Sequence, residues 1–219
     1  PLASAPPPRL LSVGLARAWR RKAGRMGAPT RPGHIVDIAT GTGDFAIALA
    51  RAIPDADVTG LDLSEGMVTL GRTKITAAGL DGRVSLMTGD CLDAPLPPCS
   101  ADAITVAFGV RNFADLAAGY RAMYHMLRPG GMLCVIELST PRSALVRPFY
   151  NLYAGHVIPL MGRLISADDS AYSYLPASIA AVPCGDAMLD LMSGAGFTDT
   201  SCTPLTLGVC TIYTAIRPE

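Results

Sequence analysis

Two glycines in a short loop are the residues of this sequence best suited to hold a nucleotide-like ligand. Gly41 and Gly43 form the pattern G-x-G-x-x-A with Ala46, directly after an apolar run. Asp62 follows Gly43 by 19 positions. This spacing is typical of dinucleotide-binding loops, in which glycine lets the ligand approach the backbone and the acid binds ribose hydroxyls. The pattern therefore predicts a nucleoside-binding site.

The charge of this loop bears on which nucleoside is bound. Asp44 stands at the start of the helix expected after the glycines, and Asp37 precedes them. A helix N-terminus attracts the pyrophosphate of a dinucleotide, and these two carboxylates would oppose that anion. A ligand with an ammonium and a sulfonium, such as S-adenosylmethionine, is favoured instead. Two alternatives stay open: an acid that only complements the helix dipole, and an NAD-dependent dehydrogenase.

The remaining contacts of such a ligand are expected where the next strands end. The ribose hydroxyls would meet Asp62, and the adenine would lie against Asp90 and Cys91. A carboxylate at this place can accept a hydrogen bond from the adenine amino group.

Short apolar runs alternate with helical segments through the first two thirds of the chain, which is typical of strands buried on both faces of a parallel sheet. The expected strands are His34–Thr40, Asp57–Ser64, Arg83–Asp90, Ala103–Phe108 and Met132–Ser139. The expected helices are Asp44–Ile53, Glu65–Ala78 after a Ser64 cap, and a segment from Asp115 to Arg128 that ends at Pro129-Gly130-Gly131. This alternation predicts a doubly wound α/β sheet.

The C-terminal part adds a helix near Asp186–Ala195 and two strands, roughly Thr200–Thr206 and Val209–Arg217. Only Leu207-Gly208 separates the two strands, so they are expected to be antiparallel neighbours. The segment between these parts, Thr140–Pro183, does not fit the alternation. We expect it to form a partly helical insertion over the carboxyl ends of the strands, where α/β folds bind ligands. A structural cap without a ligand is the alternative.

Composition excludes several classes of protein. Of the 219 residues, 50% are hydrophobic and 16% are charged, and 18 basic residues balance 18 acidic ones. The mean hydropathy is +0.34. A disordered chain needs low hydrophobicity and a high net charge, and a nucleic-acid-binding protein usually has a basic surplus. Neither class fits, and the longest uncharged stretches are too short for a membrane-spanning helix.

Metal binding is not expected from the sequence. The six cysteines include no CxxC pair, and the three histidines are widely spaced. Neither set matches a zinc pattern, and the cysteines are typical of buried thiols in a reducing cytoplasm. The proline-rich head Pro1–Pro8 does not have the charged start and apolar run of a signal peptide. We expect residues 1–9 to be a disordered or truncated head of a single domain covering residues 1–219.

Five motifs together resemble the class I S-adenosylmethionine-dependent methyltransferases, specifically the ubiquinone/menaquinone biosynthesis C-methyltransferases. The resemblance runs from about Leu10 to the end of the chain. The glycine loop and the LRPGG motif are shared by many methyltransferases, whereas FGVRNF and AYSYLP are more particular to this family. The motifs are Trp19-Arg20-Arg21, Asp37–Asp44, Ala107–Phe113, Leu127–Gly131 and Ala171–Pro176.

The resemblance implies a Rossmann-like, mostly parallel seven-stranded sheet with an antiparallel last strand and an inserted substrate cap. It also implies C-methylation of a polyprenylated quinol, most directly demethylmenaquinol to menaquinol. The alternatives are C-methylation of 2-methoxy-6-polyprenyl-1,4-benzoquinol and methylation of another small molecule. The cofactor would be S-adenosyl-L-methionine, released as S-adenosyl-L-homocysteine. Its contacts carry over to Thr42, Asp62, Asp90 and Cys91, and Ala107 stands where several members have serine.

A quinol carbon becomes nucleophilic when a ring hydroxyl loses its proton. Arg111 and Asn112, just after an expected strand, are placed to stabilise the phenolate that forms. A guanidinium is a poor base, so a water held by Arg111 or a nearby acid would take the proton. His156 and the insertion tyrosines are weaker candidates. An ion pair that only fixes the loop is the alternative role of Arg111.

The lipid tail of such a substrate requires an apolar path. Val146–Leu164 can line this path or rest on a membrane surface, with Arg147 and Arg163 at its ends; a dimer contact or ordinary core is the alternative. Leu10–Lys22 is a second basic amphipathic segment, but in the family it is part of the fold. The resulting expectations are a cytoplasmic protein with peripheral membrane contact, a homodimer, and no nucleic-acid partner. The family also has a Tyr-Asp-x-Met-Asn segment where this chain has Pro1–Pro8.

Overall fold

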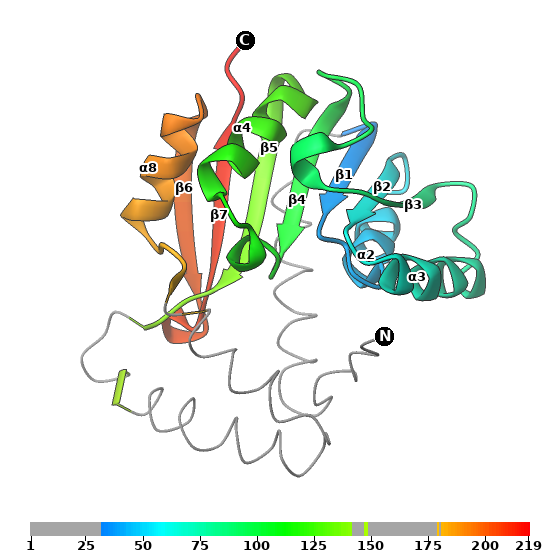
Figure 1. Cartoon of the computed structure of the whole chain (residues 1–219), viewed down its shortest axis with the longest axis horizontal. Helices are drawn as coiled ribbons and strands as arrows, with labels where there is room; N and C mark the ends of the chain where they lie inside the picture. The colour runs from blue at the N-terminus through cyan, green and yellow to red at the C-terminus, as the bar shows by residue number, and fades with distance from the viewer. Residues whose placement is uncertain (1–31, 142–146, 149–178, 180) are drawn as a thin grey trace.

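The computed structural model of the chain describes residues 32–141, 147–148, 179 and 181–219. These residues form one seven-stranded sheet of order β3-β2-β1-β4-β5-β7-β6 (Figure 1). Its strands are β1 (His34–Ile38), β2 (Asp57–Asp62), β3 (Val84–Thr88), β4 (Ala101–Ala107), β5 (Leu127–Leu138), β6 (Thr198–Leu205) and β7 (Cys210–Ile216). Every expected strand is present, within a few residues of its expected bounds except at the start of β5.

One strand of the described sheet runs against the others. The pairs β1–β2, β1–β4, β2–β3 and β4–β5 are parallel, whereas β7 is antiparallel to both β5 and β6. The turn between β6 and β7 is the short helical segment η5 (Thr206–Gly208). The expected mostly parallel sheet with an antiparallel last strand is therefore confirmed.

Helices cover both faces of this sheet (Figure 1). On one face lie α2 (Asp44–Ala52) and α3 (Glu65–Ala77), and on the other lie α4 (Leu116–Met126) and α8 (Asp186–Gly194). The predicted caps are present, since the Ser64 and Asp115 side chains accept from the N–H groups of Met67 and Ala118. Such caps satisfy N–H groups that have no partner within the helix.

The core consists of two apolar layers, one on each face of the sheet. Alternate residues of one strand point to opposite faces, so Ile35 belongs to the layer under α2 and α3, whereas Val36 belongs to the layer under α4 and α8. Both side chains are almost fully buried. Burial on both faces explains why the central strands appear in the sequence as continuous apolar runs.

The end of α4 differs from the expectation. The helix stops at Met126, and Leu127–Leu138 is one strand, so Arg128 lies in β5 and not in the last turn of the helix. The cause is the C-terminal segment. The Arg217 side chain donates to the carbonyls of Tyr124 and Leu127, and the Gly130 N–H donates to the Arg217 carbonyl. Gly130 has φ 73°, and the register of β4 and β5 shifts between Ala101 and Ala103, so the predicted glycine turn is present as an irregularity within the strand.

Several expectations concern residues outside the described ranges. These are the head at 1–9, the basic segment 10–22, the Trp-Arg-Arg motif, His156, the insertion tyrosines, most of 140–183, and the AYSYLP motif. The division into one domain with an inserted cap likewise stays a prediction. No helix among the described residues is long and apolar enough to cross a membrane.

Candidate functional site

The crevice at the carboxyl ends of β1 and β4 is where the order of the sheet reverses direction. The chain turns away immediately after both strands, with Ala39 at φ 53° and Phe108 at φ 60°. Positive φ values are uncommon for residues other than glycine and cluster at functional sites. A Cβ added to Gly109 would lie 2.5 Å from the Ala39 Cβ, so the two turns are in close contact. Ligands of open α/β sheets bind at this kind of switch point.

The glycine loop lies at this crevice and is fixed by Asp62. Gly41 has φ 57°, and a Cβ added to it would meet no atom of the described residues within 4 Å, so these residues leave open space beside its backbone. The Gly41 N–H donates to Asp62 Oδ2 at 2.7 Å, and the Ser64 N–H donates to Asp62 Oδ1 at 2.9 Å. Asp62 is half-buried at the end of β2. The structure thus joins two predicted cofactor residues, 21 positions apart, at one place.

Asp37 supports the loop from within the sheet. Its side chain is fully buried, and its two carboxylate oxygens accept hydrogen bonds from the hydroxyls of Thr40, at 2.6 Å, and Thr105, at 2.7 Å. A carboxylate in this position is costly unless hydrogen bonds satisfy it, as they do here. The geometry therefore supports a structural role for Asp37 in holding β1 and β4 together below the loop. Its direct contact with a cofactor stays a prediction.

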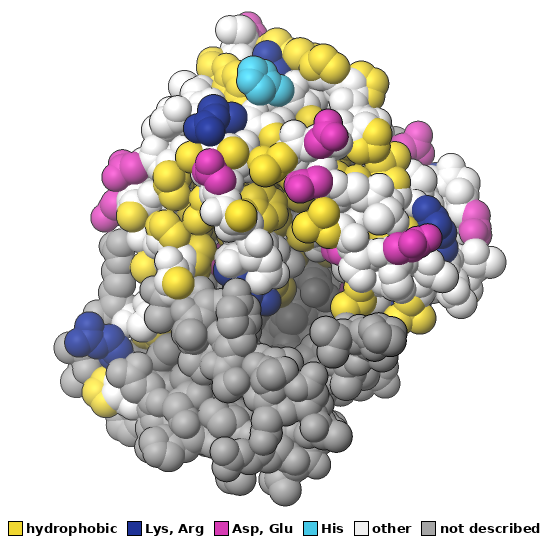
Figure 2. Space-filling view, in the orientation of Figure 1, with side chains coloured by type: hydrophobic (Ala, Val, Ile, Leu, Met, Phe, Trp, Pro, Cys, Tyr) yellow, Lys and Arg dark blue, Asp and Glu magenta, His cyan; other side chains and the backbone are white. Residues whose placement is uncertain are grey.

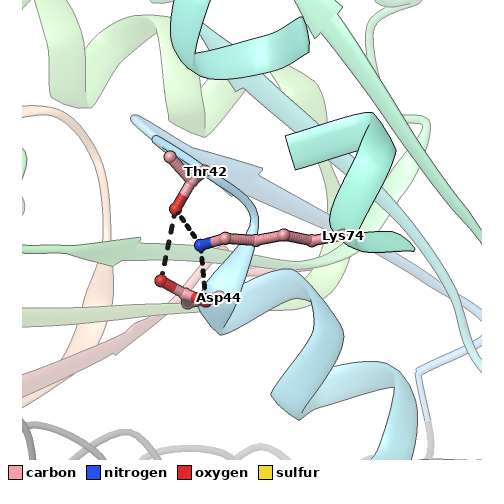
Figure 3. Close-up of polar contacts among 3 residues, drawn as sticks. All are labelled: Thr42, Asp44 and Lys74. Carbon is pink, nitrogen blue, oxygen red and sulfur yellow. Dashed lines mark hydrogen bonds and ion pairs between the residues drawn. The ribbon is translucent and has the colours of Figure 1, made fainter. Parts of the chain in front are cut away.

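Lys74 modifies the charge argument made from the sequence. Its ammonium lies 3.0 Å from Asp44 Oδ1 and donates to the Thr42 hydroxyl at 2.6 Å, and that hydroxyl lies 3.2 Å from Asp44 Oδ2 (Figure 3). The positive charge of Lys74 therefore balances the negative charge of Asp44 at the start of α2. The repulsion of a pyrophosphate inferred from Asp44 alone is weaker than the sequence suggests. Lys74, which lies in α3, was not predicted from the sequence. Its hydrogen bond holds the hydroxyl of Thr42, a predicted cofactor contact.

Asp90 and Cys91 lie after β3 at the same edge of the sheet. Asp90 is exposed and caps the short helix η2 (Cys91–Asp93) by accepting from the Leu92 N–H at 2.9 Å. Burial, with a smaller effect of Asp90, raises the pKa of the Cys91 thiol to about 12. Cys91 is therefore a neutral packing group at pH 7, whereas Asp90 remains accessible to a ligand.

Two exposed leucines flank this part of the site and were missed from the sequence. Leu63 follows Asp62 directly and is 72% exposed, and Leu92 follows Cys91 and is 50% exposed. Large apolar side chains with this exposure are available for packing against a planar ring. They could have been recognised in the sequence from their position, because each leucine comes one residue after a predicted cofactor contact. Ala107, another predicted contact, is half-buried at the end of β4 and pairs with Ile136.

Arg111 forms a buried ion pair with Glu137. Its Nη1 lies 2.7 Å from Glu137 Oε1, and its backbone N–H donates to Glu137 Oε2 at 3.2 Å. The Arg111 side chain is 16% exposed and that of Glu137 is 1% exposed. Arg111 lies in η3 (Val110–Asn112), two residues after Gly109, and Glu137 lies near the end of β5. The loop-fixing ion pair considered from the sequence is therefore present, beside the β1–β4 crevice.

Asn112 is exposed, and its backbone N–H donates to the Gly109 carbonyl at 3.0 Å. Glu137 was not predicted as a site residue. Its signal in the sequence is that it is the one charged residue of the apolar run 132–139, close to the end of an expected buried strand. A charge in such a position requires a partner, and Arg111 supplies it. Among the described residues, no group of three acids, cysteines or histidines is placed to hold a metal ion.

Comparison with known proteins identifies the family. The model of the ubiE/COQ5 methyltransferase family matches residues 8–217. The chain belongs to this family. Its relatives include the demethylmenaquinone methyltransferases of Bacteroides fragilis (44% identical, covering 94% of this chain and 84% of that one) and Porphyromonas gingivalis (46%, covering 95% and 85%). The ubiquinone/menaquinone biosynthesis C-methyltransferase UbiE of Geotalea daltonii is 42% identical, covering 94% and 88%.

Solved structures confirm the fold. Phosphoethanolamine N-methyltransferase 2 of Haemonchus contortus, in complex with S-adenosyl-L-methionine, superposes with a TM-score of 0.69 at 14% identity, covering 92% of this chain and 53% of that one. A methyltransferase from Bacillus halodurans gives 0.68 at 18% identity, covering 92% and 100%. The predicted α/β methyltransferase fold and, through membership of the ubiE/COQ5 family, the predicted methyltransferase activity are confirmed.

Proposed function

We propose that the chain transfers a methyl group from S-adenosyl-L-methionine to a ring carbon of a polyprenylated quinol, converting demethylmenaquinol to menaquinol. The names of the Bacteroides and Porphyromonas relatives support this substrate. The name of the Geotalea relative covers the ubiquinone pathway as well, so the corresponding benzoquinol is the second candidate.

The residues at the β1–β4 crevice fit this cofactor. Open space beside Gly41 admits a ligand close to the backbone, and Asp62 and Asp90 are accessible carboxylates for ribose hydroxyls and an adenine amino group. Leu63 offers an apolar surface beside Asp62 for the adenine ring. Thr42, fixed by Lys74, completes the set. When bound, the cofactor supplies an activated methyl group on its sulfonium.

The reaction needs a nucleophilic ring carbon next to that methyl group. Loss of a ring hydroxyl proton gives a phenolate, whose electrons form the new bond from the ring carbon to the methyl carbon as the bond from sulfur to the methyl carbon breaks. The ring carbon then gives up its hydrogen as a proton, and the oxygen is protonated again. The net products are the methylated quinol, S-adenosylhomocysteine and one proton.

Arg111 is the residue best placed to stabilise the phenolate. It is a fixed cation beside the crevice, and Asn112 presents an exposed amide next to it. Pre-oriented donors of this kind stabilise charge that develops during a reaction. Glu137 accepts three hydrogen bonds, from Arg111 Nη1, the Arg111 N–H and the Leu138 N–H. We therefore assign Glu137 as a positioning residue for Arg111, and the proton acceptor as a water held by Arg111.

The single observation that carries this assignment is the Arg111–Glu137 pair beside the β1–β4 crevice. A cation held on a buried carboxylate has a fixed position, which catalysis by charge stabilisation requires. The membrane contact, homodimer and cytoplasmic location expected from the sequence stay predictions. They are compatible with a lipid-tailed substrate.

The test is product analysis with a panel of quinols and deuteromethyl-labelled cofactor. We expect the label on a ring carbon of a prenylated naphthoquinol, as determined by mass spectrometry and NMR, and slower labelling of 2-methoxy-6-polyprenyl-1,4-benzoquinol. Label on oxygen, or labelling of unrelated small molecules only, would contradict the proposal. In the native host, deletion of the gene should cause demethylmenaquinone to accumulate.

A further inference from the structure

A cavity of about 300 Å³ lies two strands away from the cofactor crevice, at the same edge of the sheet. It is formed between the β6–β7 hairpin, the end of β5 and the residues just before α8. Its described lining includes Ser139, Cys184, Cys202, Pro204, Leu207 and Thr211. None of the site residues described above lines it.

Cross-strand pairing places this cavity next to the Arg111–Glu137 pair. Glu137 of β5 is directly opposite Thr211 of β7, and Thr211 is directly opposite Pro204 of β6. Paired residues point to the same face of the sheet, and neighbouring strands lie about 4.8 Å apart. The row from Glu137 to Pro204 therefore spans about 10 Å. The cavity therefore begins within about 10 Å of Glu137, close enough for a chain attached to a ligand at Arg111 to reach it.

The chemistry of the lining selects an uncharged, apolar occupant. No charged side chain is among the described residues that line the cavity. The Ser139 hydroxyl lies 2.9 Å from the Thr211 hydroxyl and 2.9 Å from the Gly208 carbonyl, so these polar groups satisfy one another. Besides Thr140 and the backbone of Gly185 and Gly208, the rest of the lining is methyl, methylene and sulfur surface. An apolar cavity of about 150 Å³ holds a benzene ring, so this one has room for about ten carbon atoms.

The exposure and backbone conformation of Leu207 give separate support for an apolar ligand at the same place. This leucine is 76% exposed, the highest exposure of any large hydrophobic residue in the described chain, and its backbone is left-handed at φ 58°. A bulky residue in that conformation is uncommon and indicates a constraint other than stability. An asparagine or glycine would suit this turn better. The apolar side chain thus lies at the wall of the apolar cavity, despite its exposure and its strained backbone.

We propose that this cavity binds the first isoprenoid units of the polyprenyl tail of the quinol, with Leu207 packing against the chain where it leaves the protein. The inference rests on the proposed function, and it adds the subsite that distinguishes a tailed quinol from a bare ring. The ring then lies at Arg111, with its tail along the row from Glu137 to Pro204.

The first test does not require methyl transfer. Cys202 lines the cavity, Cys99 is exposed elsewhere, and neither is in a disulfide. We expect farnesol, a short isoprenoid alcohol used below its solubility limit, to slow alkylation of Cys202 by a maleimide several-fold, measured by peptide mass spectrometry on the full chain, without slowing alkylation of Cys99. Equal rates with and without farnesol at Cys202 would overturn the proposal.

The second test is kinetic. We expect the ratio of kcat/KM for a diprenyl naphthoquinol to that for the tail-less ring to fall about tenfold in Leu207→Asn and in the cavity-filling variant Cys202→Phe. Leu70→Gln, which removes another exposed leucine on α3, is the matched control and should keep the wild-type ratio.

The outcomes separate this inference from the proposed function. If wild type methylates both quinols and the ratio is unchanged in both variants, the tail subsite is wrong and the proposed function stands. If farnesol protects Cys202 but no quinol is methylated, the apolar subsite stands and the proposed function fails. If Leu207→Asn lowers binding to phosphatidylcholine vesicles while leaving both the ratio and the protection unchanged, the hairpin contacts a membrane and the proposal is overturned.

Discussion

The guanidinium of Arg111 is held 2.7 Å from the carboxylate of Glu137, a side chain only 1% exposed, at the point where β4 and β5 end side by side. The pair joins two parts of the chain 26 residues apart. Arg111 follows the turn after β4 that borders the β1–β4 crevice, and Glu137 is paired with Thr211, which lines the apolar cavity of the β6–β7 hairpin.

Replacing Glu137 by glutamine should impair catalysis more than cofactor binding. Glutamine cannot balance the charge of Arg111, so the guanidinium loses its fixed position, and we expect kcat to fall at least tenfold with the Kd for S-adenosylmethionine nearly unchanged. The loss of a buried partner should also cost about 3 kcal/mol of unfolding free energy. Both are measured with purified protein, by steady-state kinetics and urea denaturation.

The matched control is the ion pair of Arg128 with Asp102, at 2.8 Å, in which the arginine is 53% exposed. Arg128→Gln should cost under about 1 kcal/mol because exposed ion pairs contribute little. A Glu137→Gln variant as active and as stable as Arg128→Gln would contradict the role of the buried pair.

Asp62→Asn should weaken cofactor binding. The two oxygens of Asp62 accept from the Gly41 and Ser64 N–H groups, and the amide nitrogen of asparagine cannot accept from either. The glycine loop would then lose a hydrogen bond that holds it in place, and the site would lose the negative charge expected to face the ribose. We expect the Kd for S-adenosylhomocysteine to rise about tenfold or more by isothermal titration calorimetry. Asp57→Asn, at the exposed start of the same strand, is the control and should bind normally.

Gly109→Ala tests the close approach of the two turns at the crevice. The added Cβ would lie 2.5 Å from the Ala39 Cβ, so the turns after β1 and β4 must move apart. We expect a loss of 1–3 kcal/mol, the usual cost of overpacking, together with weaker cofactor binding. Gly82→Ala is the control because, within the part of the chain that the structure describes, its added Cβ meets nothing within 4 Å. Equal thermal stability and equal affinity of the two variants would show that the contact is unimportant.

Buried thiols should make the protein less stable at alkaline pH. Burial raises the pKa of Cys134 from 9.0 to about 12, and burial together with a nearby carboxylate does the same for Cys210, beside Glu137, and Cys91, beside Asp90. Between pH 9 and pH 12 the unfolded chain loses these protons while the folded chain keeps them. The stability contribution is therefore complete below pH 9 and declines above it, by about 1.4 kcal/mol per pH unit for each thiol.

The measurement is urea denaturation in reducing buffer at several pH values from 8 to 11. The variant Cys134→Ala removes one of the three thiols and should show a shallower decline than wild type, whatever its stability at pH 8. A parallel decline in the two proteins would argue against this contribution of Cys134.

Local sequence signals predicted the sheet and the place of the glycine loop between β1 and α2. Apolar runs gave the strands because both faces of the sheet are covered, and Ser64 and Asp115 marked helix starts because their side chains cap free N–H groups. The end of α4 was misjudged because its carbonyls are bonded by Arg217, a residue some 90 positions away. No local pattern around Pro129-Gly130-Gly131 carries that information.

The same limit applies to the candidate site. Asp62 and the glycines could be proposed from the sequence because their spacing along the chain is fixed by one strand, one helix and one loop. Glu137 and Lys74 were missed because their partners, Arg111 and Asp44, become neighbours only through the packing of separate elements. The pairing of charges that are distant in the sequence depends on the tertiary structure. For this reason the repulsion of an anionic ligand by Asp44 was overestimated from the sequence.

The central claim is that Arg111 stabilises charge on the substrate during methyl transfer. Its most direct test is a single-turnover measurement with enzyme preloaded with S-adenosylmethionine, comparing wild type, Arg111→Lys and Arg111→Ala on a prenylated naphthoquinol. We expect the rate of methyl transfer to fall by about 100-fold or more in Arg111→Ala, with partial retention in Arg111→Lys and a nearly unchanged cofactor Kd. A wild-type rate in Arg111→Ala at unchanged cofactor affinity would contradict the account.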